Sequence, residues 1–145
     1  MLIERDIVAS NKGRVYFSLA GYRFNPDDVT RHLDIEPTSV NREGASSDAG
    51  KPAISSWELS TETSVDDVDV YSMTRDLLKK IEQKKEAILE VIERYNLSPR
   101  VGVVLVLSVD KGESAPDVGL GSRAIRFLAD IGAFIDIDYQ LSNRI

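Results

Sequence analysis

The chain has 145 residues and a formal net charge of −6; 42% of its residues are hydrophobic, 29% are charged, and none is cysteine. This length and balance are typical of one globular domain with a single core, and they exclude an intrinsically disordered chain. The acidic balance argues against nucleic-acid binding, because a phosphate backbone would be repelled. The lack of cysteine excludes disulfides, thiolate metal sites and a cysteine nucleophile.

The ends of the chain and its apolar runs predict a protein that does not cross a membrane. The start, MLIERDIVAS, lacks the cationic segment and long apolar run of a secretory signal. The longest apolar stretch, VGVVLVLSV, is far shorter than the roughly 20 residues of a membrane-spanning helix. We expect a cytoplasmic protein with a single domain over 1–145 and a core between about 14 and 141. Residues 1–13 are either a tail or an extra strand that folds onto the sheet through an Asn-Lys-Gly turn.

The first predicted elements are a strand and a short helix. Residues 14–24, RVYFSLAGYRF, are rich in β-branched and aromatic residues, which favours a strand. NPDDVTRHL then predicts a helix with Asn25 as its N-cap and Pro26 in its first position. Pro37 cannot continue a helix, so we expect the chain to leave the helix there.

The middle of the chain predicts a loop, a strand and one long helix. Residues 41–54 are rich in glycine, serine and proline and indicate a loop, and SSWELST at 55–61 alternates as a half-buried edge strand does. After an acidic connector, residues 72–96 predict a long amphipathic helix. Its apolar stripe comprises Leu77, Ile81, Ile88, Ile92 and Tyr95, with Leu78 and Leu89 beside it.

The last third predicts a strand, a helix and a strand. Residues 100–109, RVGVVLVLSV, are apolar on both faces, as a central strand is. A loop follows, and GSRAIRFLADIG predicts a helix capped by Ser122 and ended by Gly132. Residues 133–141, AFIDIDYQL, alternate between apolar and polar side chains and predict an edge strand.

These elements predict an α+β fold with a four-stranded, mostly antiparallel sheet built from two β-α-β units. The first and third strands are the most apolar and are expected in the centre, and the second and fourth at the edges. This order is a variant of the ferredoxin-like arrangement, with the long amphipathic helix between the two units. A hairpin normally joins the second and third strands there, so the direction of the strands around the helix stays open.

One face of the predicted sheet is a candidate interface. If Val15, Phe17 and Leu19 face the helices, Tyr16 faces the other way. Val104 and Val106 of the third strand are assigned to the same face as Tyr16. Such a face is too apolar to be bare in water, so the N-terminal segment, a partner subunit or a ligand is expected to cover it.

The chain resembles a bacterial family, the domain of unknown function 4279 family. The resemblance rests on VYFSLAGYRFNPDDVTRHLDIEPT, Gly44, SSWELS, the long charged helix and RFLADIGAFIDIDYQL, in the same order over roughly residues 14–140. It implies a compact α+β domain, but the family has no assigned activity, so no catalytic residue follows from it. Its relatives are suspected of acting in small conflict or immunity gene clusters.

No catalytic, cofactor or metal residues are assigned from the sequence, because each candidate group also has a simple structural explanation. His32, the only histidine, could pair with Asp28, yet a helix-surface residue explains it. Asp136 and Asp138 lie on one face of a strand and could bind a cation, but a solvated edge strand predicts the same residues. The GLGS run at 119–122 could hold an anion on its amides or form a simple turn into a helix.

The remaining candidate contacts surround the loop after the first helix. Arg42 could supply a bidentate fork for an anion, although a rigid structural turn is the favoured interpretation and Trp57 is expected in the core. The candidate ligand or partner contacts are Thr38, Arg42, Glu43 and Trp57.

Two functions are therefore considered. The favoured one is a non-enzymatic protein-interaction domain, immunity-type or homodimeric, which binds a protein partner or a second copy and needs no cofactor. The alternative is a small-molecule-binding domain or enzyme with a pocket near residues 37–44 and Trp57.

Overall fold

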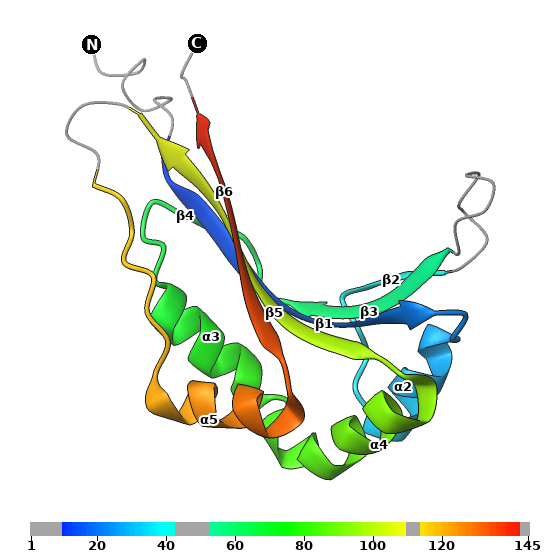
Figure 1. The fold of residues 1–145 in the computed structure, drawn as a ribbon. Helices are drawn as coiled ribbons and strands as arrows, with labels where there is room; N and C mark the ends of the chain where they lie inside the picture. Colours follow the sequence, from blue (N-terminus) through cyan, green and yellow to red (C-terminus); the bar gives the residue numbers. More distant parts are fainter. Residues whose placement is uncertain (1–9, 43–52, 110–113, 143–145) are drawn as a thin grey trace.

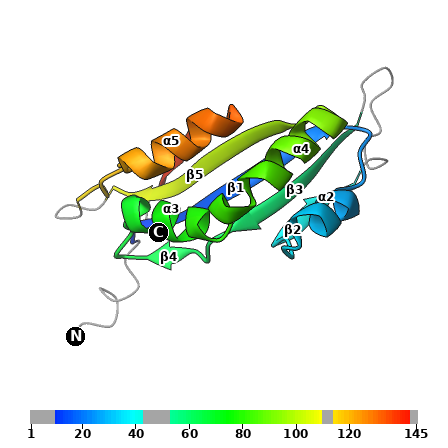
Figure 2. The same ribbon diagram turned by 90° about the horizontal axis from the view of Figure 1, so that it is seen from below.

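The computed structural model describes residues 10–42, 53–109 and 114–142. They form one curved mixed sheet that carries its helices on a single face (Figure 1). Viewed from the helix side, the helices lie in front of the sheet (Figure 2). Among these residues, no helix is long and apolar enough to cross a bilayer.

The two central strands are the ones expected from their apolar sequences. The strand order is β2-β3-β1-β5-β6, with β4 also paired to β1, and every pairing is antiparallel except β5 with β6. The bounds are β1 Lys12–Tyr22, β2 Ser39–Asn41, β3 Ile54–Ser60, β4 Ser64–Val65, β5 Ser98–Ser108 and β6 Phe134–Ser142.

The α+β class is confirmed, but the four-stranded ferredoxin-like detail is not. The short strands β2 and β4 extend the sheet, and β2 covers part of the edge that β3 was expected to form. In a ferredoxin-like order the second and third strands would be neighbours, whereas β3 and β5 flank β1 on opposite sides. The helical connection between β3 and β5 passes beneath β1. It is a crossover, because β5 runs parallel to β3 on the other side of β1.

The first helix, α2 (Pro26–Leu33), begins as predicted. Asn25 is its N-cap and accepts a hydrogen bond from the backbone N–H of Asp27 at 3.0 Å, and Pro26 occupies the first position. The helix ends at Leu33, before Pro37, because Asp34 adopts the left-handed conformation and donates its N–H to the Thr30 carbonyl.

The single long helix predicted for 72–96 is wrong: α3 (Val70–Lys79) and α4 (Lys85–Tyr95) are separated by the 3₁₀ turn η1 (Glu82–Lys84). The N–H groups of Lys80 and Ile81 reach back only three residues, to carbonyls of the last turn of α3. α3 and α4 lie under different ends of the curved sheet (Figure 1). The break falls in a charged run, and it lets both halves follow the curvature.

The last helix, α5 (Ser122–Ile131), ends at Gly132 as predicted, where φ is +72°. Its N-cap is Gly121 rather than Ser122, and no side chain caps it. The core lies between the helices and the sheet and includes Val15, Phe17, Leu19, Leu33, Trp57, Leu77, Ile81, Ile88, Val91, Val101, Val103, Leu105, Phe127 and Leu128.

The Asn-Lys-Gly turn, one of the two alternatives for the N-terminal segment, is not formed, because Lys12 and Gly13 belong to β1. Asn11 is buried: its Nδ2 donates to the Ser114 carbonyl at 2.7 Å, and its Oδ1 accepts from the Ser108 N–H at 2.8 Å. The bond to Ser108 holds the start of β1 against the end of β5, and the bond to Ser114 ties it to the segment before α5. Residues 1–9 lie outside the described ranges.

Candidate functional site

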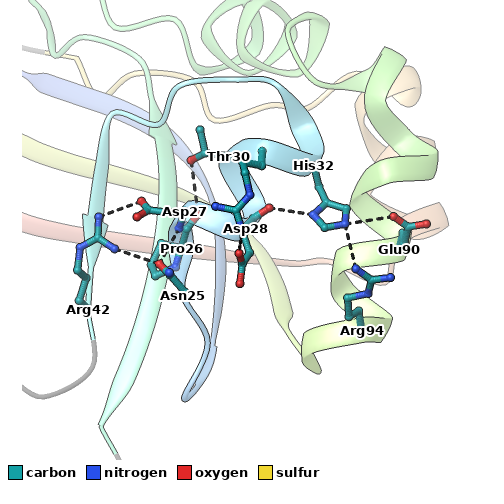
Figure 3. A network of polar contacts seen from close by, with 10 residues as sticks. Asn25, Pro26, Asp27, Asp28, Thr30, His32, Arg42, Glu90 and Arg94 are labelled. Atoms are coloured by element: carbon teal, nitrogen blue, oxygen red, sulfur yellow. Dashed lines mark hydrogen bonds and ion pairs between the residues drawn. The ribbon is translucent and has the colours of Figure 1, made fainter.

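Arg42, a candidate ligand contact, lies beside the N-terminus of α2 and is already paired (Figure 3). Its guanidinium approaches the Asp27 carboxylate at 3.0 Å and donates to the Asn25 side-chain oxygen at 3.2 Å. The cation thereby ties the end of β2 to the first turn of α2. Glu43, the neighbouring candidate, lies outside the described residues.

Thr38 extends the sheet. Its backbone N–H donates to the Glu58 carbonyl at 2.7 Å, and its side-chain oxygen accepts from the Ser60 N–H at 2.9 Å. The following residues, Ser39–Asn41, pair with β3 as strand β2. The segment interpreted as a stiff turn is therefore a short edge strand, because its backbone groups find partners on β3.

Trp57 is buried, as its strand pattern predicted, with no exposed surface. The indole Nε1–H donates to the Thr30 hydroxyl oxygen at 3.0 Å, which links β3 to α2. A ligand that enters near residues 37–42 does not meet this ring in the described conformation. Trp57 is therefore a core residue, whereas Thr38 and Arg42 are exposed at the surface.

His32 lies between α2 and α4 (Figure 3). Its Nδ1 is 2.9 Å from the Asp28 backbone oxygen, and its Nε2 is 3.2 Å from Arg94 and 3.5 Å from the Glu90 carboxylate. The Asp28 carboxylate pairs instead with Arg31. His32 contacts the backbone of Asp28, not its carboxylate, and its ring joins two helices at the surface.

The two aspartates of β6 are exposed or half-buried. Asp136 lies 3.6 Å from Arg100 on β5, and Arg100 also stacks over the Phe134 ring at 4.7 Å. Within the described ranges, no group of three or more histidine, aspartate or glutamate side chains could hold a metal ion.

A pocket of about 310 Å³ lies between α3 and the N-terminus of α5, where the GLGS run ends. Its cationic side chains include Arg75 and Arg123, which pair with Asp76 at 3.1 Å and Glu82 at 2.8 Å. Tyr71 fills the space beside Gly121: a Cβ there would lie 2.9 Å from its ring. The arginine charges are thus already balanced by carboxylates.

The predicted interface residues share the sheet face that points away from the helices. Tyr16, Val104 and Val106 are half-buried, and Tyr16 lies over Gly102, where a Cβ would be 2.1 Å from the ring. The Arg14 guanidinium stacks on the Tyr16 ring at 5.1 Å. Side chains of the chain itself thereby cover part of this face. Its role in binding stays a prediction.

Among the described residues, an exposed apolar stripe lies elsewhere, on strand β6, and sequence reasoning did not single it out. Its members face the same side of the sheet as the β5 residues with which they pair, of which Val101, Val103 and Leu105 are buried, but no helix covers the stripe closely enough to bury it. The stripe comprises Ile135 (41% exposed), Ile137 (49%), Tyr139 (64%) and Leu141 (67%).

The stripe lies on a strand with a single neighbour. In the described part of the chain, β6 pairs with β5 and forms the last strand of the sheet. Its outer edge therefore presents backbone N–H and C=O groups beside four exposed apolar side chains. The strict alternation of this segment was the available signal, but alternation does not reveal whether a helix covers the apolar face.

Comparison with known proteins places the chain in a family. Residues 11–142 match the domain of unknown function DUF4279. The chain belongs to the DUF4279 family. No curated protein and no solved structure matches it.

The residues that carry the DUF4279 resemblance have structural roles in this chain. In the Leu-x-Ile-x-Pro-Thr run, Leu33 is buried and Ile35 packs against the core, while Thr38 pairs with β3. Trp57, in the SSWELS segment, is bonded to Thr30 of α2. In this DUF4279 domain these residues therefore build the joint between α2 and β3.

Proposed function

We propose that this DUF4279 domain is a protein-interaction module without catalytic activity, and that the stripe on β6 is its docking surface. The supporting observation is the combination of four exposed apolar side chains with an outer strand edge. An edge strand of this kind can accept a further strand through backbone hydrogen bonds, while its alternate side chains give specificity.

The proposal covers two kinds of partner, a second copy of the chain or another protein that the domain masks in an immunity-type role. It places the protein in the bacterial cytoplasm, in keeping with the cysteine-free sequence. Tyr16, Val104 and Val106 are a second contact surface in this proposal. The alternative, a small-molecule pocket at Arg42 and Trp57, has less support because Arg42 is paired and Trp57 is buried.

The test compares two double variants that carry the same substitutions. Ile137→Lys with Tyr139→Lys places two charges on the stripe, where the side chains are 49% and 64% exposed. The matched control, Ile125→Lys with Tyr22→Lys, changes the same residue types at other sites, 51% and 57% exposed. Circular dichroism first establishes that both variants fold.

The readout is complex formation, measured by light scattering for self-association and by capture and mass spectrometry for other proteins. We expect the wild type and the control to form the same complex, and the β6 variant to lose it. A β6 variant that retains the complex, or a wild type that forms none, would overturn the proposal. Arg42→Ala tests the alternative: loss of small-molecule binding with intact folding would support a pocket at the loop.

A further inference from the structure

Strand β6 lacks several of the devices by which edge strands avoid pairing. It is nine residues long, and its register with β5 runs without a bulge from Phe134 to Ser142. It contains neither proline nor lysine. Natural edges are commonly protected by such residues or by bulges. The charges it does carry, on Asp136 and Asp138, lie on the opposite face from the stripe, so they restrict how a second strand aligns without blocking its approach.

We propose that β6 pairs antiparallel with β6 of a second copy, about a two-fold axis through Tyr139, so that the two sheets become one. This inference rests on the proposed function and names the partner of that surface. A two-fold axis brings the same patch of both copies together. A two-fold axis normal to the sheet keeps the stripes of both copies on the same side of the joined sheet. Such an axis also requires one residue of β6 to lie opposite the same residue of the second copy.

The carboxylates select the register. An axis through Ile137 would place Asp136 opposite the second copy's Asp138, and an axis through either aspartate would place that residue opposite itself. Like charges directly opposite on neighbouring strands are destabilising. An axis through Tyr139 avoids each of these pairs.

With the axis at Tyr139, the facing residues are complementary on both sides of the sheet. On the stripe, Ile137 faces Leu141 and Tyr139 faces itself. On the other side, Asp138 faces Gln140, whose amide can donate to the carboxylate. Residues 136–142, nearly the whole of the strand, are then paired. An axis through Gln140 would shorten the pairing to 138–142 and leave Ile137 outside it.

The lack of cysteine in the sequence makes the register directly measurable. A disulfide forms only where two Cα atoms come within about 7 Å. Under mild oxidation with a copper catalyst, Tyr139→Cys is expected to form a covalent dimer, because this residue faces itself. Ile137→Cys alone is the matched control. In this register, residue 137 lies opposite residue 141 of the second copy, so the two cysteines at position 137 are four residues apart along the strands and too far for a disulfide.

A mixture of two single variants completes the register test. Ile137→Cys and Leu141→Cys are each expected to stay monomeric on a denaturing gel, and their mixture to give a covalent dimer. Cross-linking of Ile137→Cys alone, with none for Tyr139→Cys, would overturn the register. The three side chains are about half exposed or more, so little core packing is lost, and circular dichroism checks that each variant folds.

Solution mass separates this inference from the proposed function. We expect light scattering to report a dimer for the wild type at about 100 μM, a hundredfold above a micromolar dissociation constant, and a monomer for Ile137→Lys with Tyr139→Lys. A monomeric wild type overturns self-pairing. If that monomer binds another protein and the lysine variant does not, the proposed function stands. A dimer that persists in the lysine variant overturns self-pairing through β6, and a lysine variant that also keeps every other protein partner overturns the proposed function.

Discussion

The bond between Trp57 and Thr30 ties β3 to α2 at the level of single residues. The indole is buried, and the Thr30 hydroxyl is its hydrogen-bond partner at 3.0 Å. A buried donor without a partner costs free energy, so the threonine contributes to stability mainly by satisfying the tryptophan. Arg42, by contrast, forms an ion pair in which both side chains are more than half exposed, and such pairs contribute little.

A double-mutant cycle tests the coupling between these two side chains. We expect Thr30→Val to lower the free energy of unfolding by about 1–3 kcal/mol, because it leaves the indole N–H unsatisfied. In a Trp57→Phe background the same substitution is expected to cost less than about 0.5 kcal/mol, since no donor remains. Urea unfolding followed by circular dichroism measures both values. Equal costs in the two backgrounds would contradict the coupling.

Gly102 lets Tyr16 cover the centre of the sheet. We expect Gly102→Ala to lower the free energy of unfolding by about 1–3 kcal/mol, because the new methyl group meets the Tyr16 ring and displaces it. Gly119→Ala is the control: nothing lies within 4 Å of a Cβ there, and a change within about 0.5 kcal/mol is expected. Urea unfolding of the three proteins checks this. A Gly102 variant as stable as its control would show that Tyr16 is free to move.

The helices show how capping and packing act at the level of elements. Side chains cap α2 and α3 at their N-termini, where Asn25 and Asp69 accept backbone N–H groups. The amphipathic pattern over residues 72–96 did not prevent the break between α3 and α4. Local capping therefore determined where α2 and α3 begin, while packing on the curved sheet determined how far the helices continue.

The cap of α3 gives a prediction at this scale. Asp69 accepts from the Ser72 N–H at 3.2 Å, so Asp69→Ala is expected to lower the free energy of unfolding by about 0.5–2 kcal/mol. Asp67→Ala removes the same charge from an exposed position outside the cap and is expected to change it by less than about 0.5 kcal/mol. Thermal unfolding of both variants measures the difference. Equal effects would assign the loss to charge rather than to capping.

The whole molecule presents a sheet whose two edges differ. The short strand β2 covers part of β3 at one side, and β6 with its stripe forms the other. Each copy carries a formal charge of −6, so the proposed dimer forms against long-range repulsion. Salt screens that repulsion, and association is expected to tighten as salt is added.

Dimer formation also predicts that stability depends on concentration. We expect the urea midpoint of the wild type to rise with protein concentration, because association stabilises the folded state by mass action. The midpoint of Ile137→Lys with Tyr139→Lys is expected to stay constant, while the Ile125→Lys with Tyr22→Lys control behaves as the wild type does. A wild-type midpoint that does not change over a hundredfold range of concentration would contradict the dimer.

Local patterns predicted much of the fold and part of the candidate site. Asn25 and Pro26 predicted the start of α2, and the alternation around Trp57 predicted its burial, because caps and periodicity act within a few residues. Alternation also placed Tyr16, Val104 and Val106 on the face away from the helices. The Thr38 and Arg42 candidates were recognised as residues of one segment, but their partners on β3 and α2 could not be read from it.

What only the tertiary structure decided is which surfaces are covered. The sequence by itself determined that β6 has an apolar and a polar face, since successive side chains of a strand point to opposite sides. It did not determine that β6 pairs with β5 at the end of the sheet, or that Ile137 and Tyr139 would be exposed. Pairing and coverage depend on segments distant along the chain, because the path of the helices decides which strands they bury.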